Sequence, residues 1–515
     1  MSKTVENMYE GSQEKEFLGH PIGLGICFLT ELWERFSYYG MRAILILFLT
    51  KYYLYSAEQA SGIYGAYIAM IYMLPLLGGY FADRYLGSRK AVIYGGLLLV
   101  LGHFSLAFEG PPAYLDGNTV VRDEGYQSMF FFSLALIITG VGFLKANIST
   151  IVGKLYGEKD PRRDGGFTIF YMGINIGSVT SIALVGYVGE TYGWSYGFLI
   201  AGVGMLLGLL VFLWGQKFLD GRAEPPKPSE LKEKAFAFVN KENAIYLFGI
   251  VLVFMSWLLI QYQTILGYTL GASGLIMIFG LIVYAVTKCD PTERDRLIVA
   301  VSLIAMQSLF WALFEQQGAS LTLLADQQFN LHFLGMDILA SQVQLLNAGF
   351  IVMLAPVVAW MWVAMARKGF EPSTPSKFGW GMVLIGLGYI VFSYGMDIDQ
   401  GSNKSFFWLI WIYLMLTLAE LCVSPVGLSM VTKLSPARTV GLLMGTWFLF
   451  TAMGNYVAGW ISSLTGSGGH GASSAQLDVV ATMEVYTNIG LLSFGIGVVI
   501  FVFTPLMKKY MHGVH

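Results

Sequence analysis

Charged residues are scarce in this chain of 515 residues. Asp, Glu, Lys and Arg make up 12% of it, whereas hydrophobic residues make up 55%. A soluble globular domain carries about 25% charged residues, so the deficit indicates that most of the surface faces lipid. The formal net charge is −2, which gives no reason to expect nucleic acid as a partner.

Cysteine is rare too, and motifs of enzyme chemistry are missing. Cys27, Cys289 and Cys422 lie in or beside apolar segments without the spacing of a disulfide or metal site, so we expect small buried side chains. The sequence has no paired-histidine metal motif, no Gly-x-Ser-x-Gly segment and no phosphate-binding loop. We therefore expect neither an enzyme, a metal nor a cofactor.

Apolar segments long enough to cross a bilayer recur along the chain. A spanning helix needs about 20 mainly apolar residues. Such windows lie at residues 22–52, 58–82, 89–109, 127–153, 165–190, 195–217, 243–263, 266–288, 295–325, 338–366, 377–395, 405–431, 438–465 and 480–507. These fourteen windows predict an all-α integral membrane protein with 14 transmembrane helices.

A polar stretch from about Gln216 to Asn243 divides these spans. It is charged and carries three prolines, Pro225, Pro226 and Pro228. We predict an N-terminal six-helix bundle at 1–217, a cytoplasmic linker at 218–242, two inserted transmembrane helices at 243–290 and a C-terminal six-helix bundle at 291–515. The alternative is fourteen spans in an unrelated fold.

The loop between spans two and three supports the first interpretation. It reads Gly78-Gly79-Tyr80-Phe81-Ala82-Asp83-Arg84, followed by Gly87 and Arg89-Lys90. This Gly-x-x-x-Asp-Arg pattern resembles the signature loop of the major facilitator superfamily. The resemblance implies two six-helix bundles that move about a central site.

Positive charge predicts the orientation. With both termini in the cytoplasm, 25 of the 31 lysines and arginines fall in inner segments and three in outer ones, as the positive-inside rule requires. The remaining three, Arg35, Arg42 and Lys145, lie within spans.

The first span carries ionisable side chains on one helical face. They are Glu31, Glu34, Arg35, Tyr38 and Arg42. Charge within a bilayer is unfavourable and usually functional, so we expect this face to line a wet cavity or other polar helices. The alternative for the two acids is a structural salt bridge, from Glu31 to Arg35 at i,i+4.

Three later spans carry one charge each. Lys145 lies in span four, Glu315 in span seven and Glu420 in span ten. With span one, the deep groups comprise three bases and four acids, so one carboxylate is in excess. A buried carboxylate without a partner can take up a proton near neutral pH, which is the chemistry of a proton-coupled carrier.

Several motifs together resemble the proton-dependent oligopeptide transporter (POT) family, bacterial type, within the major facilitator superfamily. The segment 31–40 is similar to that family's Glu-x-x-Glu-Arg-Phe-x-Tyr-Tyr-Gly motif, and 170–178 to its span-five signature. Trp311 with Glu315, Glu420 with Ser424 and Pro425, and Trp447 also match.

The sequence departs from that family at three places. Lys145-Ala146-Asn147 and Asn347-Ala348 have alanine where proline is frequent, which puts local helix kinks in doubt. The span-two histidine of animal members is absent, so coupling has to rest on carboxylates.

The resemblance implies a proton-coupled symporter that imports di- and tripeptides across the bacterial inner membrane by alternating access, as a monomer. Arg42 and Lys145 are expected to hold the peptide carboxylate, and Glu420 the ammonium group. Proton coupling is assigned to Glu31, Glu34, Arg35, Lys145 and Glu315, with the proton on Glu315. Further substrate contacts are assigned to Tyr38, Tyr39, Tyr72, Asn175, Trp311, Asn347, Ser424 and Trp447.

Other functions remain open at this point. A carrier for another anion, such as nitrate, can use the same scaffold, although nitrate-transporting members are not expected to keep the full Glu-x-x-Glu-Arg set. A channel would not accumulate its solute against a gradient, so reconstituted uptake separates a channel from a carrier.

Overall fold

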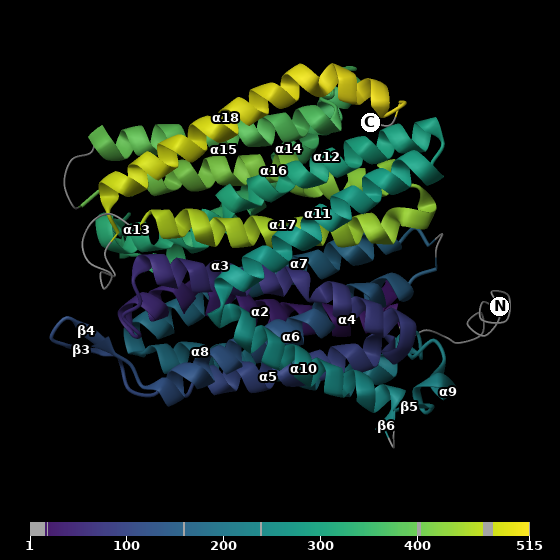
Figure 1. The fold of residues 1–515 in the computed structure, drawn as a ribbon, viewed down its shortest axis with the longest axis horizontal. Coiled ribbons are helices and arrows are strands. Elements are labelled where there is room, and N and C mark those ends of the chain that lie inside the picture. Colours follow the sequence, from purple (N-terminus) through teal and green to yellow (C-terminus); the bar gives the residue numbers. More distant parts are fainter. Residues whose placement is uncertain are drawn as a thin grey trace.

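The computed structural model describes residues 16–17, 19–157, 160–236, 239–398, 403–466 and 477–513. Its long helices run side by side along the longest axis (Figure 1). The helices of the spans are α2 (Ile22–Lys51), α3 (Ala57–Met73) with α4 (Pro75–Phe81), α5 (Gly87–Leu106), α6 (Glu124–Lys154), α7 (Arg163–Tyr192), α8 (Trp194–Gly215), α10 (Lys241–Gln261), α11 (Gln263–Lys288), α12 (Pro291–Phe314) with α13 (Ser320–Gln328), α14 (Leu345–Arg367), α15 (Thr374–Ile398), α16 (Phe407–Leu434), α17 (Val440–Leu464) and α18 (Val479–Tyr510).

These helices agree with the predicted spans. By length and composition, 12 helical segments of the described residues are apolar enough to cross a membrane. One of them, Ala57–Leu106, is 50 residues long and contains α3, α4 and α5, so it crosses twice. Helix α2 is not among the 12, since its charged residues lower its hydropathy. Counting Ala57–Leu106 as two crossings and adding α2 gives fourteen crossings among the described residues, as the sequence predicts.

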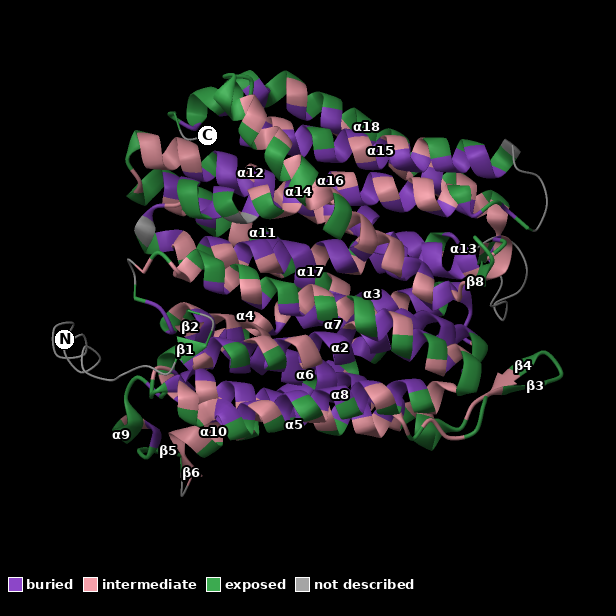
Figure 2. Cartoon of the chain, turned by 180° about the vertical axis from the view of Figure 1, so that it is seen from behind, coloured by how far each residue is buried: buried purple, intermediate pink, exposed green. Residues whose placement is uncertain are grey.

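Short elements lie at the two ends of the helix bundle. One end, here named the hairpin end, carries β3 and β4, and the opposite end, the terminal end, carries β1, β2, α9, β5, β6 and the end of α18 (Figures 1 and 2). Within the described residues the strands pair as four antiparallel hairpins: β1 (Glu16–Phe17) with β2 (His20–Pro21), β3 (Tyr114–Asp116) with β4 (Thr119–Val121), β5 (Lys234–Phe236) with β6 (Val239–Asn240), and β7 (His332–Phe333) with β8 (Met336–Asp337). The short helices are η1 (Ala82–Leu86), η2 (Gln216–Leu219), α9 (Pro228–Leu231), η3 (Glu315–Gly318), η4 (Ala340–Gln344) and η5 (Ala437–Thr439).

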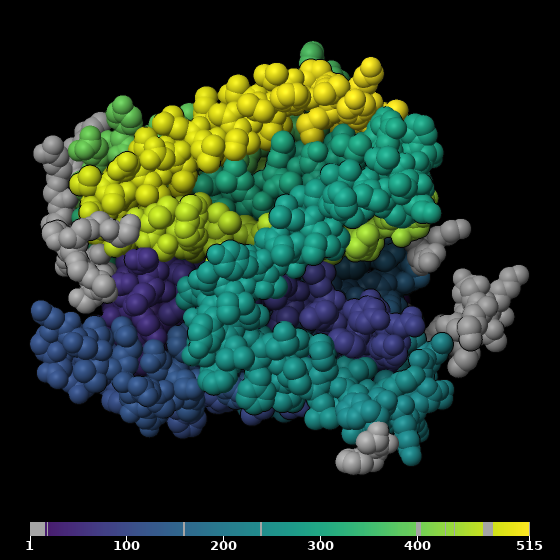
Figure 3. All heavy atoms as spheres, in the orientation of Figure 1, coloured from purple at the N-terminus to yellow at the C-terminus, as the bar shows by residue number. Residues whose placement is uncertain are grey.

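Helix α2 is the central helix of the N-terminal set, α2–α8. It packs against α7 and α8, and most of its residues are buried (Figure 2). In the C-terminal set, α12–α18, helix α15 packs against α16 and α18, and α12 against α16 and α17. The inserted helices α10 and α11, teal in Figure 3, cover the boundary between the two sets on the near face.

The two sets are joined tightly at the hairpin end. Helices α3 and α17 touch where a Cβ on Gly65 would lie 2.5 Å from the Cα of Gly459. Beside them, the Ser61 and Ser462 hydroxyls are 2.7 Å apart. Lys51 Nζ, at the end of α2, forms an ion pair with Asp326 Oδ1 at 2.6 Å. Glycine at position 65 is therefore needed for the close approach of the two backbones.

A cavity reaches the other end. Its volume is about 880 Å³. Its walls are formed mainly by α14 and α16 and include Tyr171 of α7. It extends from Glu420 to Lys433 and Lys508, which end α16 and α18 at the terminal end. The molecule is thus closed at the hairpin end and hollow toward the terminal end.

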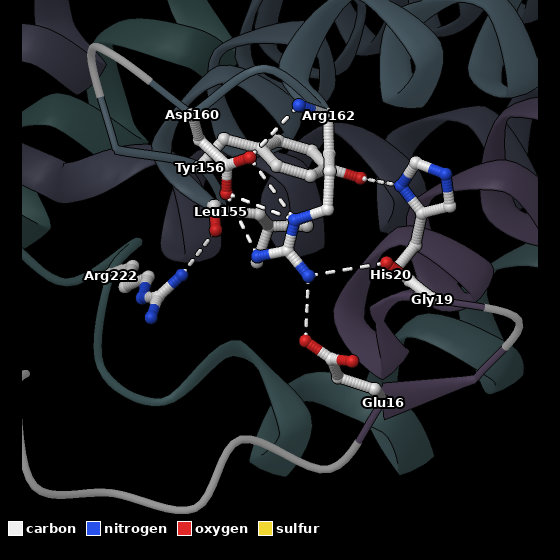
Figure 4. Close-up of polar contacts among 8 residues, drawn as sticks. All are labelled: Glu16, Gly19, His20, Leu155, Tyr156, Asp160, Arg162 and Arg222. Carbon is white, nitrogen blue, oxygen red and sulfur yellow. Dashed lines mark hydrogen bonds and ion pairs between the residues drawn. The ribbon is translucent and has the colours of Figure 1, made fainter.

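A polar cluster holds the first described residues at the terminal end (Figure 4). Arg162, which precedes α7, donates to Glu16 Oε1 at 2.6 Å and to Asp160 Oδ2 at 2.9 Å. This guanidinium lowers the pKa of the Asp160 carboxyl. His20 Nδ1 lies 2.8 Å from the Tyr156 hydroxyl. These contacts connect β1 and β2 to the segment between α6 and α7.

The three cysteines are free, as their spacing predicts. Cys27 and Cys422 are buried, but Cys289 is only partly buried. The expectation of a buried side chain is wrong there because Cys289 follows the last residue of α11, at a helix end rather than inside a span.

We expect Gly65→Val to prevent closure of the hairpin end, because the added side chain meets the α17 backbone. Overpacking of about 1–3 kcal/mol would shift the equilibrium roughly 5- to 150-fold away from the closed form. The measurement is thiol labelling of a cysteine placed at Ser61 in a cysteine-free background. The control is Gly271→Val, since a Cβ at Gly271 meets nothing within 4 Å. Equal labelling of both variants would contradict the role assigned to Gly65.

Candidate functional site

The acids of the first span lie around Arg35. Arg35 Nε donates to Glu31 Oε1 at 2.7 Å and lies 2.9 Å from Glu34 Oε2. All three side chains are buried. The i,i+4 salt bridge that the sequence offered as an alternative is therefore present. The Glu34 carboxylate, although close to Arg35, accepts no hydrogen bond from the described residues.

Arg42 connects the two sets of helices. Its Nη2 donates to Glu315 Oε2, and its Nε donates to the Tyr64 hydroxyl at 2.7 Å. Arg42 lies on α2, Tyr64 on α3 and Glu315 at the start of η3. A guanidinium that is 5% exposed is thus held by one residue from each of two other elements.

A break in the seventh span positions Glu315. Helix α12 ends at Phe314, continues as the 3₁₀ turn η3 through Gly318, and resumes as α13 at Ser320. A Cβ on Gly318 would lie 3.1 Å from Arg42 Nη2 and still closer to the Tyr64 hydroxyl. The absence of a side chain at Gly318 therefore leaves room for the Arg42 contacts. The sequence predicted one continuous span here.

Lys145 packs against an aromatic ring. Its Nζ lies 4.0 Å from the centroid of the Tyr72 ring. Within the part of the chain that the structure describes, Lys145 belongs to none of the ion pairs, including those of Glu31 and Glu34. Helix α6 runs unbroken through Lys145-Ala146-Asn147, so the helix that lacks the family's proline there shows no interruption.

Glu420 lies on the opposite set of helices, in α16. It accepts a hydrogen bond from Asn347 Nδ2 at 3.2 Å, and Asn347 also donates to Thr417 at 3.0 Å. Glu420 and Ser424 line the cavity with Tyr171. Asn347 lies in the first turn of α14, directly after η4. This carboxylate has an amide partner and faces an open space.

The other predicted site residues make contacts with one another or with residues of the surrounding helices, and several of them do not line the cavity. Tyr38 and Tyr39 stack edge to face at 5.0 Å, and Trp311 Nε1 donates to Gln307 Oε1 at 2.6 Å. Trp447 is buried, and its carbonyl accepts from Gln307 Nε2 at 2.8 Å. Asn175 donates to the Tyr171 carbonyl of its own helix. The walls of the 880 Å³ cavity do not include Arg42, Lys145, Asn175 or Trp447.

Tyr64 and Gln307 could not be recognised as site residues from the sequence. Both are uncharged, and a tyrosine or glutamine within a span gives no signal that separates a site residue from a packing residue. Their importance follows from contacts: Tyr64 holds Arg42, while Gln307 connects Trp311 to Trp447.

Comparison with known proteins is consistent in sequence and in fold. A family model described as "POT family" matches residues 89–474. The chain is 35% identical to an uncharacterized transporter, YclF, of Bacillus subtilis over 99% of both chains. It is 36% identical to the peptide transporter YePEPT of Yersinia enterocolitica, with 93% of each chain covered. It is 35% identical to a di-/tripeptide transporter of Lactococcus lactis subsp. cremoris, covering 85% of this chain and 88% of the other.

Solved structures agree over nearly the whole chain. A crystal structure of peptide transporter POT in complex with sulfate has a TM-score of 0.82 and 33% identity, covering 99% of both chains. A POT family transporter in complex with a thioalcohol conjugated peptide has a TM-score of 0.80 and 29% identity, covering 96% of this chain and 98% of that one. The predicted major facilitator fold is thereby confirmed.

We expect Gly318→Ala to weaken the anchoring of Arg42, because the new methyl group displaces the Tyr64 hydroxyl from Arg42 Nε. Loss of one buried hydrogen bond of about 1 kcal/mol corresponds to a roughly fivefold rise in the apparent KM for substrate. Uptake kinetics in proteoliposomes measure it. Gly495→Ala serves as the matched control, since a Cβ there meets nothing within 4 Å. An unchanged KM in Gly318→Ala would show that Tyr64 does not position Arg42.

Proposed function

This chain belongs to the POT family and is a multi-pass membrane transporter, and we propose that it imports di- and tripeptides together with protons. Relatives named as peptide transporters and as di-/tripeptide transporters support the substrate class. The deep charges support the coupling ion, because the acids outnumber the bases by one.

The Arg42–Glu315 pair is the observation that carries this proposal. A peptide carboxylate needs a fixed cation inside the protein, and Arg42 is such a cation, already occupied by Glu315. Two carboxylates therefore compete for one guanidinium. Protonation of Glu315 removes its negative charge and frees Arg42 for the peptide. In the opposite direction, an arriving peptide carboxylate displaces Glu315 and favours its protonation.

The other end of the peptide is assigned to Glu420. A peptide ammonium group is a cation with three donors, and Glu420 offers a carboxylate at the cavity wall, held by Asn347. Lys145, without an ion pair among the described residues, adds a second cation on the N-terminal helices. The peptide would then connect α2 and α6 to α14 and α16.

Alternating access follows from the two ends of the molecule. We infer that the terminal end faces the cytoplasm of a bacterial inner membrane, because inner segments carry most lysines and arginines. The structure then corresponds to an inward-facing state. Opening to the outside requires the contacts between α3 and α17, and between Lys51 and Asp326, to separate. We take the N-terminal and C-terminal sets as the two moving halves.

Uptake should be driven by an inward proton gradient. One pH unit is worth about 1.4 kcal/mol and 100 mV on one charge about 2.3 kcal/mol, which together allow roughly 500-fold accumulation of a neutral zwitterion per proton. Proteoliposomes with and without an imposed gradient measure this. Equal peptide concentrations on both sides despite the gradient would contradict proton coupling.

The peptide termini should be recognised separately. Arg42→Ala and Glu420→Ala should each nearly abolish uptake of free dipeptides, because removing one partner of a desolvated charge pair costs about 2–5 kcal/mol. C-terminal amidation of the peptide should weaken transport by the wild type but not by Arg42→Ala. N-terminal acetylation should weaken transport by the wild type but not by Glu420→Ala. Wild-type transport indifferent to both modifications would refute the assignment.

Glu315→Gln should uncouple the carrier, since the amide can neither bind the proton nor neutralise Arg42. Accumulation against a gradient should be lost, while counterflow between equal peptide pools should persist, because exchange never requires the empty carrier to return. Both assays use the same liposomes. The exposed Glu484→Gln on α18 is the matched control. If Glu315→Gln accumulated peptide as well as the wild type, Glu31 or Glu34 would have to hold the proton.

A further inference from the structure

Two buried tyrosine hydroxyls have no hydrogen-bond partner among the described residues. Tyr67 of α3 is 0% exposed and Tyr38 of α2 is 2% exposed. An unpaired buried donor costs about 1–3 kcal/mol, so native proteins rarely leave one without a partner. Tyr38 was assigned to the substrate from the sequence, but Tyr67 has no role in the function described above.

The other buried tyrosines differ from these two. Tyr64 accepts from Arg42 Nε, and the hydroxyls of Tyr389, Tyr413 and Tyr486 donate to Leu313 O, Gln317 O and Ser320 Oγ. Those of Tyr53, Tyr55 and Tyr156 also have protein partners. The lack of a partner is therefore specific to the two tyrosines beside the charged face of α2.

Tyr67 is within electrostatic range of both charged groups of the site. It follows Tyr64 by three residues on α3, so the two side chains are neighbours on one helical face. Its hydroxyl is within electrostatic range of Arg42 and of Glu34, and Tyr38 is within range of Arg42 and of Tyr67. From α6, Lys145 acts on the same Glu34. Tyr67 is thus near both the Glu34–Arg35 group and the Arg42–Glu315 pair, one helical turn from the Tyr64 that holds Arg42.

The carboxylates of Glu31 and Glu34 have oxygens without a hydrogen-bond donor among the described residues. Both carboxylate oxygens of Glu34 and Oε2 of Glu31 accept no hydrogen bond from the described residues. A row of buried acceptors and hydroxyls is the setting in which proteins hold ordered water, each molecule with two to four polar partners. A hydroxyl in such a row both accepts and donates, which a proton relay requires.

We propose that the Tyr67 hydroxyl relays the transported proton, through bridging water, between Glu34 and the Arg42–Glu315 pair. The hydroxyl accepts a proton from the water on the Glu34 side while its own O–H bond breaks toward the water on the Glu315 side. One O–H bond forms and one breaks, so Tyr67 stays neutral and one proton moves. This inference rests on the proposed function, since it presupposes proton coupling.

The test is Tyr67→Phe, which keeps the ring and removes only the hydroxyl. Proton-driven uptake should fall at least about tenfold, while peptide counterflow in the same liposomes stays within twofold of wild type. Tyr389→Phe is the matched control, because Tyr389 is equally buried but donates to a backbone carbonyl. It should lose little in either assay. Counterflow in the same liposomes also reports whether Tyr67→Phe is folded, so a loss of driven uptake alone cannot come from misfolding.

The outcomes separate the relay from the function beneath it. Wild-type liposomes that fail to accumulate peptide under a proton gradient refute proton coupling, and the relay with it. Accumulation by the wild type and by Tyr67→Phe alike refutes the relay alone. Equal loss of driven uptake and counterflow in Tyr67→Phe means that the hydroxyl supports structure or binding, and this too overturns the proposal.

Discussion

A guanidinium buried inside a membrane protein has to keep an anionic partner, because a bare charge in that environment is strongly unfavourable. Arg42 is 5% exposed and its partner is Glu315, which lies 273 residues away in sequence. Three other structural features make this contact possible. The helix breaks at η3 so that Glu315 turns toward α2, Gly318 leaves the space free, and Tyr64 fixes the guanidinium from α3. The N-terminal and C-terminal helices are thereby joined by a charge pair as well as by packing.

The same constraint gives a physical reason for the proposed proton coupling. The deep groups comprise Arg35, Arg42 and Lys145 against Glu31, Glu34, Glu315 and Glu420. With one proton on Glu315 and one zwitterionic peptide bound, their sum is zero, so the loaded carrier moves no net charge across the bilayer. After the peptide and proton have left, the empty site carries one negative charge. A membrane potential that is negative inside then favours its return outward, by about 2.3 kcal/mol per 100 mV.

Much of the fold could be predicted because the bilayer imposes it. The apolar windows of the sequence match the helical spans, since each must cover the hydrocarbon thickness, although α2 falls short by hydropathy alone. The i,i+4 spacing offered the contact from Glu31 to Arg35 as an alternative. Pairings across helices could not be predicted in this way. Arg42 with Glu315 and Asn347 with Glu420 depend on tertiary packing, which spacing along one helix does not encode. The turn at η3 carries no proline, so nothing in the sequence marks it as a break in the span. Tyr64 and Tyr67 carry no charge, so they could not be distinguished from ordinary span residues. The family motifs predicted roles for Arg42, Lys145 and Glu420, which stay predictions. The structure supplied the partners of Arg42 and Glu420 and an aromatic neighbour for Lys145.

The central claim is that a peptide carboxylate and Glu315 compete for Arg42, so that peptide binding brings a proton with it. The most direct measurement is the number of protons taken up when a dipeptide binds. Calorimetry in buffers of different ionisation enthalpy gives this number for the wild type and for Glu315→Gln, near neutral pH and without any gradient. The account predicts net proton uptake, of up to one per peptide, by the wild type and none by Glu315→Gln. Binding without proton uptake by the wild type, or equal uptake by both proteins, would contradict it.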